Sequence, residues 1–272
     1  MQSRLLKALA LAVLACAIVA GPASAAPTWA PASSAAIHPG VQTLTDGAQC
    51  TANFVFYDAS NVYLGQAAHC SGTGTATETN GCDSGSLPIG TPVDIGGSQP
   101  GTLVYNSWLT MQANGETNPD TCAFNDLALV KVAAADVGKV NPSIPFWGGP
   151  TGINSSGTAQ GDTVLSYGNS SLRGGVTQLS PKQGKSVGDD GNGWSHTVYT
   201  VPPGIPGDSG SAFMDATGKA LGVLSTVAIA PLAGSNGVGD VAKELADANS
   251  TGGFGVTLAT GTEAFTGPLL PI

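Results

Sequence analysis

Three short motifs carry residues that could act together in nucleophilic catalysis. Ser209 lies in a Gly-Asp-Ser-Gly sequence, His69 follows two alanines, and Asp126 precedes the apolar run Leu-Ala-Leu-Val. A serine hydroxyl attacks a carbonyl only when a base removes its proton and hydrogen-bond donors hold the oxyanion that forms. The motif around Ser209 therefore predicts a base and an acid elsewhere in the chain, and His69 and Asp126 are the candidates.

The three side chains would have different tasks. We expect Ser209 to attack, His69 to accept its proton and return it to the leaving group, and Asp126 to orient the imidazole and stabilise its charged form. Histidine suits this role because its pKa of about 6.5 lets it act as base and then as acid near neutrality. The other histidines are weaker candidates, since His38 lies in a segment without clear periodicity and His196 lies in a strand-like run.

The two glycines of the motif have their own physical reason. The chain must turn tightly for the backbone amides of Gly207 and Ser209 to converge on one oxyanion, and a side chain at position 207 would obstruct it. The alternative is an ordinary glycine-rich hairpin turn. Pro206 before the motif, and the apolar residues Ala212 and Phe213 after it, favour the oxyanion site.

The first 25 residues predict a secretory signal peptide. Arg4 and Lys7 precede an apolar run over residues 8–20, and an Ala-Ser-Ala cleavage signal ends at position 25. The apolar run is short for a membrane span. Cys16 offers a weaker alternative, a lipoprotein signal. We therefore expect the protein to be secreted, with no membrane span.

The charge of the chain argues against nucleic acid as a partner. The sequence has 9 basic and 18 acidic residues, a formal net charge of −9. Because Arg4 and Lys7 leave with the signal peptide and no acidic residue does, the remaining chain carries −11, whereas nucleic-acid binding requires basic surface. Charged residues make up only 10% of the chain and glycines number 39, a composition that suits a secreted β protein.

Four cysteines remain after the signal peptide, and export permits disulfides. Three pairings are possible. We favour Cys50 with Cys70, because the two strand-like runs between them would lie antiparallel and bring their ends together beside His69. Cys82 and Cys122 would then close a long loop. A zinc site is the alternative, but the sequence lacks a close Cys-x-x-Cys spacing.

Short runs of β-branched and aromatic residues between Gly, Asn, Asp and Ser predict an all-β fold. The expected strands cover residues 53–57, 61–66, 91–95, 101–105, 126–132, 162–167, 175–179, 196–201, 211–214, 221–226 and 254–258. A Pro- and Gly-rich segment, residues 141–152, divides the series into two halves. The predicted parts are the signal peptide (1–25), an N-terminal arm or short pro-segment (26–47), a first β-barrel (48–146) and a second β-barrel with a C-terminal helix and tail (147–272).

One segment departs from the strand pattern. Val241, Leu245 and Ala248 have the spacing of one helix face, after a candidate cap at Asp240 and before two glycines. We expect a helix of about ten residues over 240–249, lying on the surface at one end of a barrel.

The motifs together resemble the secreted bacterial serine proteases of the chymotrypsin (trypsin-like) family. The resemblance rests on Ala-Ala-His69-Cys, Asn-Asp126-Leu-Ala-Leu and Gly-Asp-Ser209-Gly-Ser, which occur in this order with spacings of 57 and 83 residues. It covers residues 47–226 well and the C-terminal tail poorly. It implies two six-stranded antiparallel β-barrels with the active site in the cleft between them. It also implies a disulfide between Cys50 and Cys70.

The resemblance further implies substrate-binding positions. Pro203 would form the floor of the primary pocket, and Ser225 would border this pocket and support the catalytic aspartate. Thr226 follows Ser225 along the same wall, and Val227 stands where relatives with deep pockets often have glycine. An uncharged floor and a narrowed mouth imply cleavage after small or medium-sized apolar residues.

Two features depart from the family pattern. The chain lacks an Ile-Val-Gly-Gly activation sequence, so Asp208 has no new N-terminus to pair with. Because a buried unpaired carboxylate is costly, another cation must neutralise it, and Arg173 is our candidate. In addition, the predicted helix precedes a strand, whereas family members usually end in a helix. We interpret it as an insertion near the primary pocket.

The leading prediction is a secreted serine endopeptidase that acts through an acyl-enzyme. We expect it to be a monomer, to act on peptide or protein substrates, and to need no metal and no cofactor. Glu116 and Asp120 are interpreted as solvated loop residues and not as calcium ligands. Two alternatives stay open. One is a protease-like binding protein with a closed or inactive cleft, and the other is an esterase with the same triad, because an oxyanion site serves amides and esters alike.

Overall fold

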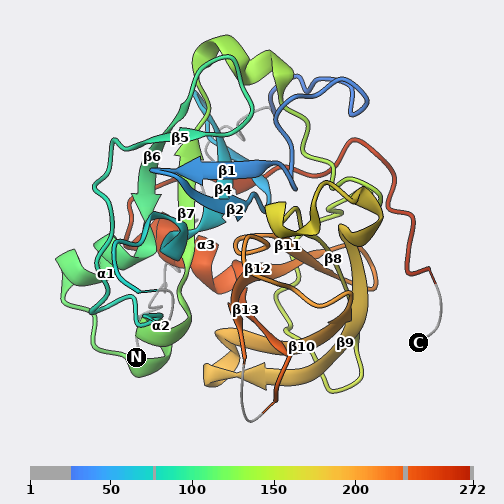
Figure 1. The fold of residues 1–272 in the computed structure, drawn as a ribbon. Coiled ribbons are helices and arrows are strands. Elements are labelled where there is room, and N and C mark those ends of the chain that lie inside the picture. Colours follow the sequence, from blue (N-terminus) through green and yellow to red (C-terminus); the bar gives the residue numbers. More distant parts are fainter. Residues whose placement is uncertain (1–25, 76–77, 229–231, 270–272) are drawn as a thin grey trace, which may run out of the picture.

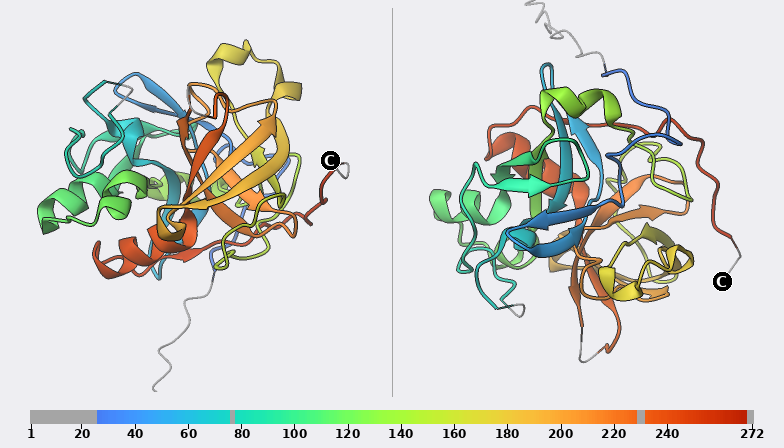
Figure 2. Two further views of the ribbon diagram at one scale, coloured as in Figure 1. Left: turned by 90° about the horizontal axis from the view of Figure 1, so that it is seen from below. Right: turned by 45° about the horizontal axis from the view of Figure 1, so that its top comes forward.

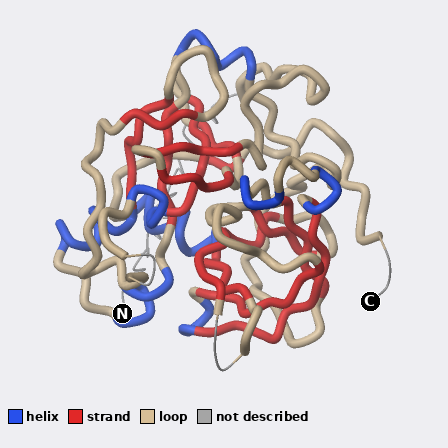
Figure 3. The backbone as a smooth tube through the Cα atoms, viewed as in Figure 1, coloured by secondary structure: helices blue, strands red, loops and turns tan. Residues whose placement is uncertain are grey.

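The structure, a computed structural model, describes residues 26–75, 78–228 and 232–269 and contains two β-units (Figure 1). The predicted signal peptide, residues 1–25, lies outside the described residues. The strands gather in two groups (Figure 3), and the two units lie side by side in both views of Figure 2.

The first unit is an antiparallel eight-stranded sheet in the order β14-β3-β4-β7-β6-β5-β1-β2. Its strands are β1 (Gln42–Thr45), β2 (Ala48–Thr51), β3 (Val55–Tyr57), β4 (Val62–Ala67), β5 (Pro92–Asp94), β6 (Gly101–Asn106), β7 (Leu127–Lys131) and β14 (Thr257–Leu258). Strand β4 is buried along its whole length and β7 along all but its last residue. Their register pairs Ala67 with Leu127, so the residues that follow β4 lie beside the residue that precedes β7.

The second unit is a closed antiparallel barrel in the order β10-β13-β12-β11-β8-β9. Its strands are β8 (Thr163–Tyr167), β9 (Pro181–Asp190), β10 (Ser195–Val201), β11 (Ala212–Asp215), β12 (Ala220–Val227) and β13 (Asn236–Asp240). One apolar cluster of this barrel contains Val164, Val198, Phe213, Leu221, Leu224 and Val238. The loop between β10 and β11 carries Ser209.

The prediction of two six-stranded barrels is correct for the second unit and wrong for the first. Within the described residues, the edge strands β2 and β14 of the first unit do not pair with each other. Strand β14 comes from the C-terminal tail and pairs with β3, with Leu258 opposite Phe56. It therefore occupies the edge of β3 that closure would need. The first unit is a curled open sheet of eight strands.

Several local predictions also differ from the structure. Residues 175–179, predicted as a strand, contain the short 3₁₀ helix η4 (Thr177–Leu179) instead. Gly174 and Gly175 before it have φ of 61° and 78°, a left-handed conformation that turns the chain out of an extended path. Strands β1, β2, β9 and β13 were not predicted. The last three have polar or glycine-rich sequences, whereas β1 lies in the segment that we predicted as an arm.

The predicted C-terminal helix is present as α3 (Val241–Ser250). Asp240 caps it by accepting a hydrogen bond from the Lys243 N–H at 2.8 Å. The helix packs against β12 and β13 of the barrel and β7 of the sheet, so it joins the two units from one side (Figure 1). Its buried face contains Val241, Leu245 and Ala248, as the spacing predicts.

Two further α-helices were not predicted from the sequence. They are α1 (Ser107–Asn114) and α2 (Pro119–Phe124), and each begins after an asparagine, Asn106 or Asn118, whose side chain accepts hydrogen bonds from the first turn. The two asparagines could have indicated helix starts, but neither helix has the long apolar stripe from which we predicted helices. The remaining short 3₁₀ helices are η1 (Ala68–Ser71), η2 (Ala134–Lys139), η3 (Ser171–Arg173) and η5 (Gly191–Gly193).

Both ends of the described chain pack onto the body of the protein. Ile37, from the segment predicted as an arm, is fully buried and bridges to Val140, and this segment also supplies β1. After β14, the tail runs along the segment between the two units, where the Gly261 N–H bonds to the Pro150 carbonyl at 2.8 Å. No helix in the part of the chain that the structure describes could cross a membrane.

Two disulfides lie in the first unit, with the pairing favoured from the sequence. Cys50 bonds to Cys70, and Cys82 bonds to Cys122. The first joins β2 to the helical turn η1, and the second joins the loop after η1 to α2. Closing such loops restricts the unfolded chain and stabilises a fold by about 2–4 kcal/mol per bridge.

Candidate active site

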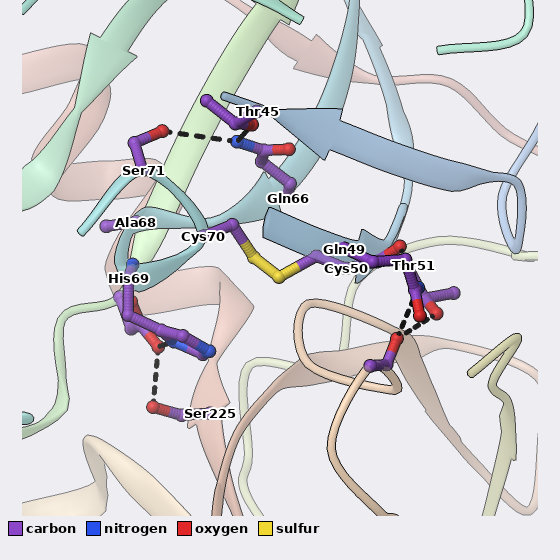
Figure 4. Close-up of a disulfide and its surroundings, with 12 residues drawn as sticks. Thr45, Gln49, Cys50, Thr51, Gln66, Ala68, His69, Cys70, Ser71 and Ser225 are labelled. Carbon is purple, nitrogen blue, oxygen red and sulfur yellow. Dashed lines mark hydrogen bonds and ion pairs between the residues drawn. A yellow bond between two sulfur atoms is a disulfide. The ribbon is translucent and has the colours of Figure 1, made fainter. Parts of the chain in front are cut away.

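His69 lies in η1, the turn that directly follows β4. The Cys50–Cys70 disulfide fastens this turn to β2 (Figure 4). The backbone N–H of His69 donates a hydrogen bond to Asp126 Oδ1 at 2.9 Å. The N–H of Ala68 donates to the Asp126 carbonyl at 2.8 Å. The pairing of β4 with β7 therefore continues into the two residues that the sequence assigned as base and acid.

The side chains of His69 and Asp126 form a close pair. His69 Nδ1 lies 2.6 Å from Asp126 Oδ2, and Ser225 Oγ donates to the same oxygen at 2.6 Å. Asp126 is 3% exposed, so its carboxylate interacts with the ring away from bulk water. Burial lowers the pKa of His69, but the charge of Asp126 and its hydrogen bond outweigh burial and raise that pKa above its ordinary value.

Ser209 lies in the loop between β10 and β11, against the first unit. Its carbonyl accepts a hydrogen bond from the Thr51 N–H at 2.8 Å, next to Cys50. A Cβ on Gly210 would lie 2.9 Å from the nitrogen of Ala67, so only glycine allows this close approach, and its φ is +85°. Ser209 Oγ and His69 form no hydrogen bond in the described part of the chain. Such bonds are often long in proteins without substrate.

The loop around Ser209 presents two backbone donors. Gly207 has φ of +92°, and its carbonyl accepts hydrogen bonds from Gln49 Nε2 at 2.9 Å and Thr51 Oγ1 at 2.8 Å. Neither the N–H of Gly207 nor that of Ser209 donates to a residue that the structure describes. An oxyanion site requires two such amides, because both must donate to the same oxygen.

Asp208 is fully buried and has internal cations as partners. Arg173 Nη2 lies 2.6 Å from Asp208 Oδ2, and Lys182 Nζ lies 3.1 Å from the same oxygen. The backbone N–H groups of Ser170 and Ile205 also donate to this carboxylate. Arg173, the candidate from the sequence, is therefore joined by a second cation that the sequence did not indicate. The loop of Ser209 is anchored from within the second barrel.

The two cations are not equivalent. Burial and the charge of Arg173 together lower the pKa of Lys182 to about 8, although the charge of Asp208 opposes this shift. Arginine keeps its charge in proteins. Arg173 also donates to the Pro203 carbonyl at 2.9 Å, which ties the loop before Ser209 to the same ion pair.

We expect Arg173→Met to lower the free energy of unfolding by about 3 kcal/mol, because it removes the permanent partner of a buried carboxylate. Lys182→Met should lower the free energy of unfolding by a smaller amount, since Lys182 is partly neutral at mildly alkaline pH. Urea unfolding at pH 8 measures both. Lys185→Met on the same strand is the control and should change stability by less than about 0.5 kcal/mol. Equal stabilities of the Arg173 variant and the wild type would contradict this account of Asp208.

The predicted primary pocket has a wall that the sequence did not reveal. Asn236, at the start of β13, is fully buried. Its Oδ1 accepts from the Gly204 N–H at 3.0 Å, and its Nδ2 lies 3.5 Å from the Gly204 carbonyl and 3.4 Å from the Thr226 carbonyl. The side chain thus joins the loop beside Pro203 to the strand of Thr226. Only the strand register, which sets Asn236 opposite Val227, brings it there.

A cavity of about 280 Å³ lies beside Ser225 and Thr226. Small and hydroxyl-bearing residues of β10, β12 and β13 line one side, and α2 lines the other. Its residues include Phe124, Ser195, Thr197, Ser225, Thr226 and Gly237. A larger cavity, about 520 Å³, lies between the N-terminal segment and the C-terminal tail, with His38, Phe146 and Glu263 in its walls. It contains none of the residues assigned to catalysis.

Two groups of titratable residues have structural explanations. His69 comes close to the sulfur atoms of Cys50 and Cys70, but both sulfurs are in a disulfide and cannot act as thiolate ligands. His196 is fully buried in the second barrel between two carboxylates, with Nδ1 2.6 Å from Asp189 and Nε2 3.1 Å from Asp240. Asp240 also caps α3, so His196 belongs to the support of that helix.

Three solved structures show what the chain is similar to. Thermobifida fusca Protease A (TFPA) has a TM-score of 0.54 and 19% identity, over 84% of this chain and 100% of that chain. Nocardiopsis Protease (NAPase) has a TM-score of 0.50 and 20% identity, over 82% and 98%. A glutamic acid specific serine protease has a TM-score of 0.51 and 18% identity, over 82% of this chain and 100% of that chain. No protein-family model and no curated protein matches the chain.

At these identities the similarity concerns the fold, and it extends over nearly the whole length of the solved proteins. The similarity is therefore one of the overall architecture and not of a single segment. The structural neighbours of this chain are bacterial chymotrypsin-like serine proteases, and the chain has their fold.

Proposed function

We propose that the chain is a secreted serine endopeptidase with Ser209 as nucleophile, His69 as base and Asp126 as the acid that orients it. The observation that carries this proposal is the buried Asp126 carboxylate, held between His69 and Ser225. The loop of Ser209 packs against the strand that leads to His69. The predicted signal peptide and the two disulfides support secretion.

The geometry supports the following reaction. Ser209 Oγ bonds to the carbonyl carbon of the scissile peptide while its proton passes to His69 Nε2. The N–H groups of Gly207 and Ser209 donate to the oxyanion. The C–N bond then breaks, the amine leaves with the proton from His69, and an ester remains on Ser209. Water hydrolyses this ester after His69 takes one of its protons, and the proton returns to Ser209.

Labelling by a fluorophosphonate tests the reaction type. The purified protein should form one covalent adduct, and peptide mapping by mass spectrometry should locate it on Ser209. It should also cleave an unstructured protein such as casein. A protein without adduct and without cleavage would be a binding protein with a closed cleft. A protein that is labelled and hydrolyses esters but not peptides would be an esterase.

The environment of Asn236 supports specificity for small or medium-sized apolar residues before the cleaved bond. Its amide crosses the space between Gly204 and Thr226, and Val227 stands at the mouth with 43% of its surface exposed. Pro203 brings no charge to this region. Among Pro203, Val227 and Asn236 there is no carboxylate that could pair with a long cationic side chain.

Asn236→Gly should therefore broaden the specificity. We expect the ratio of kcat/KM for leucine over alanine before the cleaved bond to rise about tenfold, because the removed side chain leaves room for additional methyl groups. A pair of peptides that differ only at this position measures the ratio. Asn114→Gly, the same replacement at the exposed end of α1, is the control. An unchanged ratio in the Asn236 variant would show that this residue does not limit the pocket.

A further inference from the structure

Glu244 is a fully buried acid that the reaction above does not use. It projects from α3, and none of its surface is exposed. Its Oε1 accepts a hydrogen bond from the backbone N–H of Asp126 at 2.9 Å. Its Oε2 has no hydrogen-bond partner among the described residues. Burying a carboxyl group without full compensation costs stability, so its presence at this position calls for a physical reason.

Asp126 has a partner for each of its polar groups. Oδ1 accepts from the His69 N–H, Oδ2 is shared by the His69 ring and Ser225, and the carbonyl accepts from the Ala68 N–H. The remaining group is the backbone N–H, which Glu244 holds. Ser225 and Glu244 both come from the second half of the chain, so the orientation of Asp126 depends on contacts across the two units.

The space for the Glu244 carboxyl is built into β13. A Cβ on Gly239 would lie 2.3 Å from Glu244 Oε1 and 3.1 Å from the Phe124 carbonyl. Any side chain at position 239 would therefore displace the carboxyl from the Asp126 N–H. The glycine is required here by close approach, since its φ lies outside the left-handed region.

The surroundings of Glu244 are acidic. Asp126 of the first unit, Asp240 at the start of α3 and Asp247 on α3 are near it, together with the hydroxyl of Tyr105 from β6. Burial raises the pKa of Glu244 well above its ordinary value. The hydrogen bond from the Asp126 N–H lowers this pKa, and the three aspartates raise it. The raised pKa favours the protonated form of Glu244, which adds less negative charge behind Asp126 than a carboxylate would.

We propose that Glu244 is a positioning residue for the catalytic aspartate, which it holds through the backbone N–H of Asp126. The inference rests on the proposed function. Through this bond, α3 fixes the segment between α2 and β7, and the Asp126 side chain in turn fixes the His69 ring. Displacement of Asp126 should lower kcat, because the base is misoriented. It should leave KM unchanged, because Glu244 lies behind the triad and not in the substrate pocket.

The test compares Glu244→Gln with Glu244→Met. Both replacements are neutral and close in volume, but only glutamine keeps an oxygen for the Asp126 N–H. Glu244→Met leaves one buried N–H unpaired, and we expect it to lower kcat about tenfold with KM unchanged. Glu244→Gln should keep the kcat of the wild type. The kcat values are normalised to active sites titrated with a fluorophosphonate. Lys243→Met, on the exposed face of the same helix, is the matched control.

The outcomes separate this inference from the proposed function. An unlabelled and inactive wild type would overturn the proposed function. A labelled and active wild type, with equal kcat per site in Glu244→Met, would overturn the role of Glu244 alone. Should the methionine variant not fold, the amide proton of Asp126 is compared by NMR between the wild type and Glu244→Gln. Its resonance should move as the acceptor changes from a carboxyl to an amide, and an unmoved resonance would overturn the inference.

The pH dependence of stability gives a second readout. In the folded protein Glu244 keeps its proton at a pH where the unfolded chain has lost it. The stability of the wild type therefore falls as pH rises above the ordinary range of glutamate. Glu244→Gln removes this dependence. The Tm of Glu244→Gln minus that of the wild type should increase from about pH 4 to about pH 7. A Tm difference that does not change with pH would contradict the raised pKa of Glu244.

Discussion

Replacement of Ser209 by alanine is expected to reduce kcat for a peptide substrate by about 10⁶-fold. The variant lacks the oxygen that attacks the carbonyl, and His69 then has no proton to accept. The backbone amides of positions 207 and 209 remain, so a slow hydrolysis above the uncatalysed rate should persist. Because the Ser209 hydroxyl makes no hydrogen bond within the described residues, Tm should change little. Single-turnover assays with a fluorogenic peptide measure the loss.

A neighbouring serine gives the matched control. Ser211 lies two residues further along, is fully buried, and its hydroxyl has no hydrogen-bond partner within the described residues. Ser211→Ala should keep kcat within about twofold, as expected for a buried hydroxyl that contributes no hydrogen bond. If Ser209→Ala retained more than about one thousandth of the wild-type kcat, the covalent role of Ser209 would be wrong.

Replacement of Asp126 by asparagine is expected to reduce kcat by about 10⁴-fold while the fold is retained. An asparagine side chain can present an N–H to His69 Nδ1, which stabilises the tautomer that cannot accept the proton of Ser209 through Nε2. It also removes the charge that stabilises the imidazolium. Because His69 and Ser225 share Asp126 Oδ2, the same amide nitrogen would face the Ser225 hydroxyl, which can accept a hydrogen bond from it in place of donating one.

The pH profile of the Asp126 variant provides an independent check. Asp126 raises the pKa of His69, and the reaction requires neutral His69. In the wild type, kcat/KM should therefore fall as pH decreases through this raised pKa, and in Asp126→Asn the fall should begin at a lower pH. Asp120→Asn, on α2 just before the site, is the control. If Asp126→Asn lowered kcat by less than about tenfold, Asp126 would not be the acid of the triad.

The sequence was informative where chemistry restricts the residue type. The Gly-Asp-Ser-Gly motif predicts a tight turn, and the structure places Ser209 in a loop where Gly207 and Gly210 have positive φ and the amides of Gly207 and Ser209 donate to none of the described residues. The apolar runs of β4 and β7 predicted their positions well, because both strands are buried in the sheet along nearly their whole length. The spacing of Val241, Leu245 and Ala248 likewise predicted α3.

Predictions failed where pairing between distant segments decides the outcome. Strand β14 has only two residues, and it is a strand because Leu258 meets Phe56 from the other end of the chain. That pairing occupies the edge of β3, and the predicted closure of the first barrel is wrong. Strands β9 and β13 contain many glycines and polar residues, and they are strands because both of their neighbours in the barrel offer hydrogen bonds.

The same distinction applies within the candidate site. Residue type and order alone made Ser209, His69 and Asp126 the candidates, because a hydrolytic triad needs a nucleophile, a base and an acid, and the structure brings His69 and Asp126 together. Their supporting residues, Lys182 and Glu244, have no motif. A buried lysine beside Asp208 and a buried glutamate behind Asp126 are defined by burial and by contacts between segments, which a single sequence does not contain.

The sequence by itself thus determined the β-rich architecture and the set of candidate catalytic residues, since these follow from local periodicity and functional groups. Tertiary structure decided which cations neutralise Asp208, how Asn236 joins the loop of Gly204 to the strand of Thr226, and what holds the backbone of Asp126. The physical reason is that hydrogen bonds and ion pairs depend on distances of a few ångströms between atoms. For residues far apart in the chain, only the strand register and helix packing set those distances.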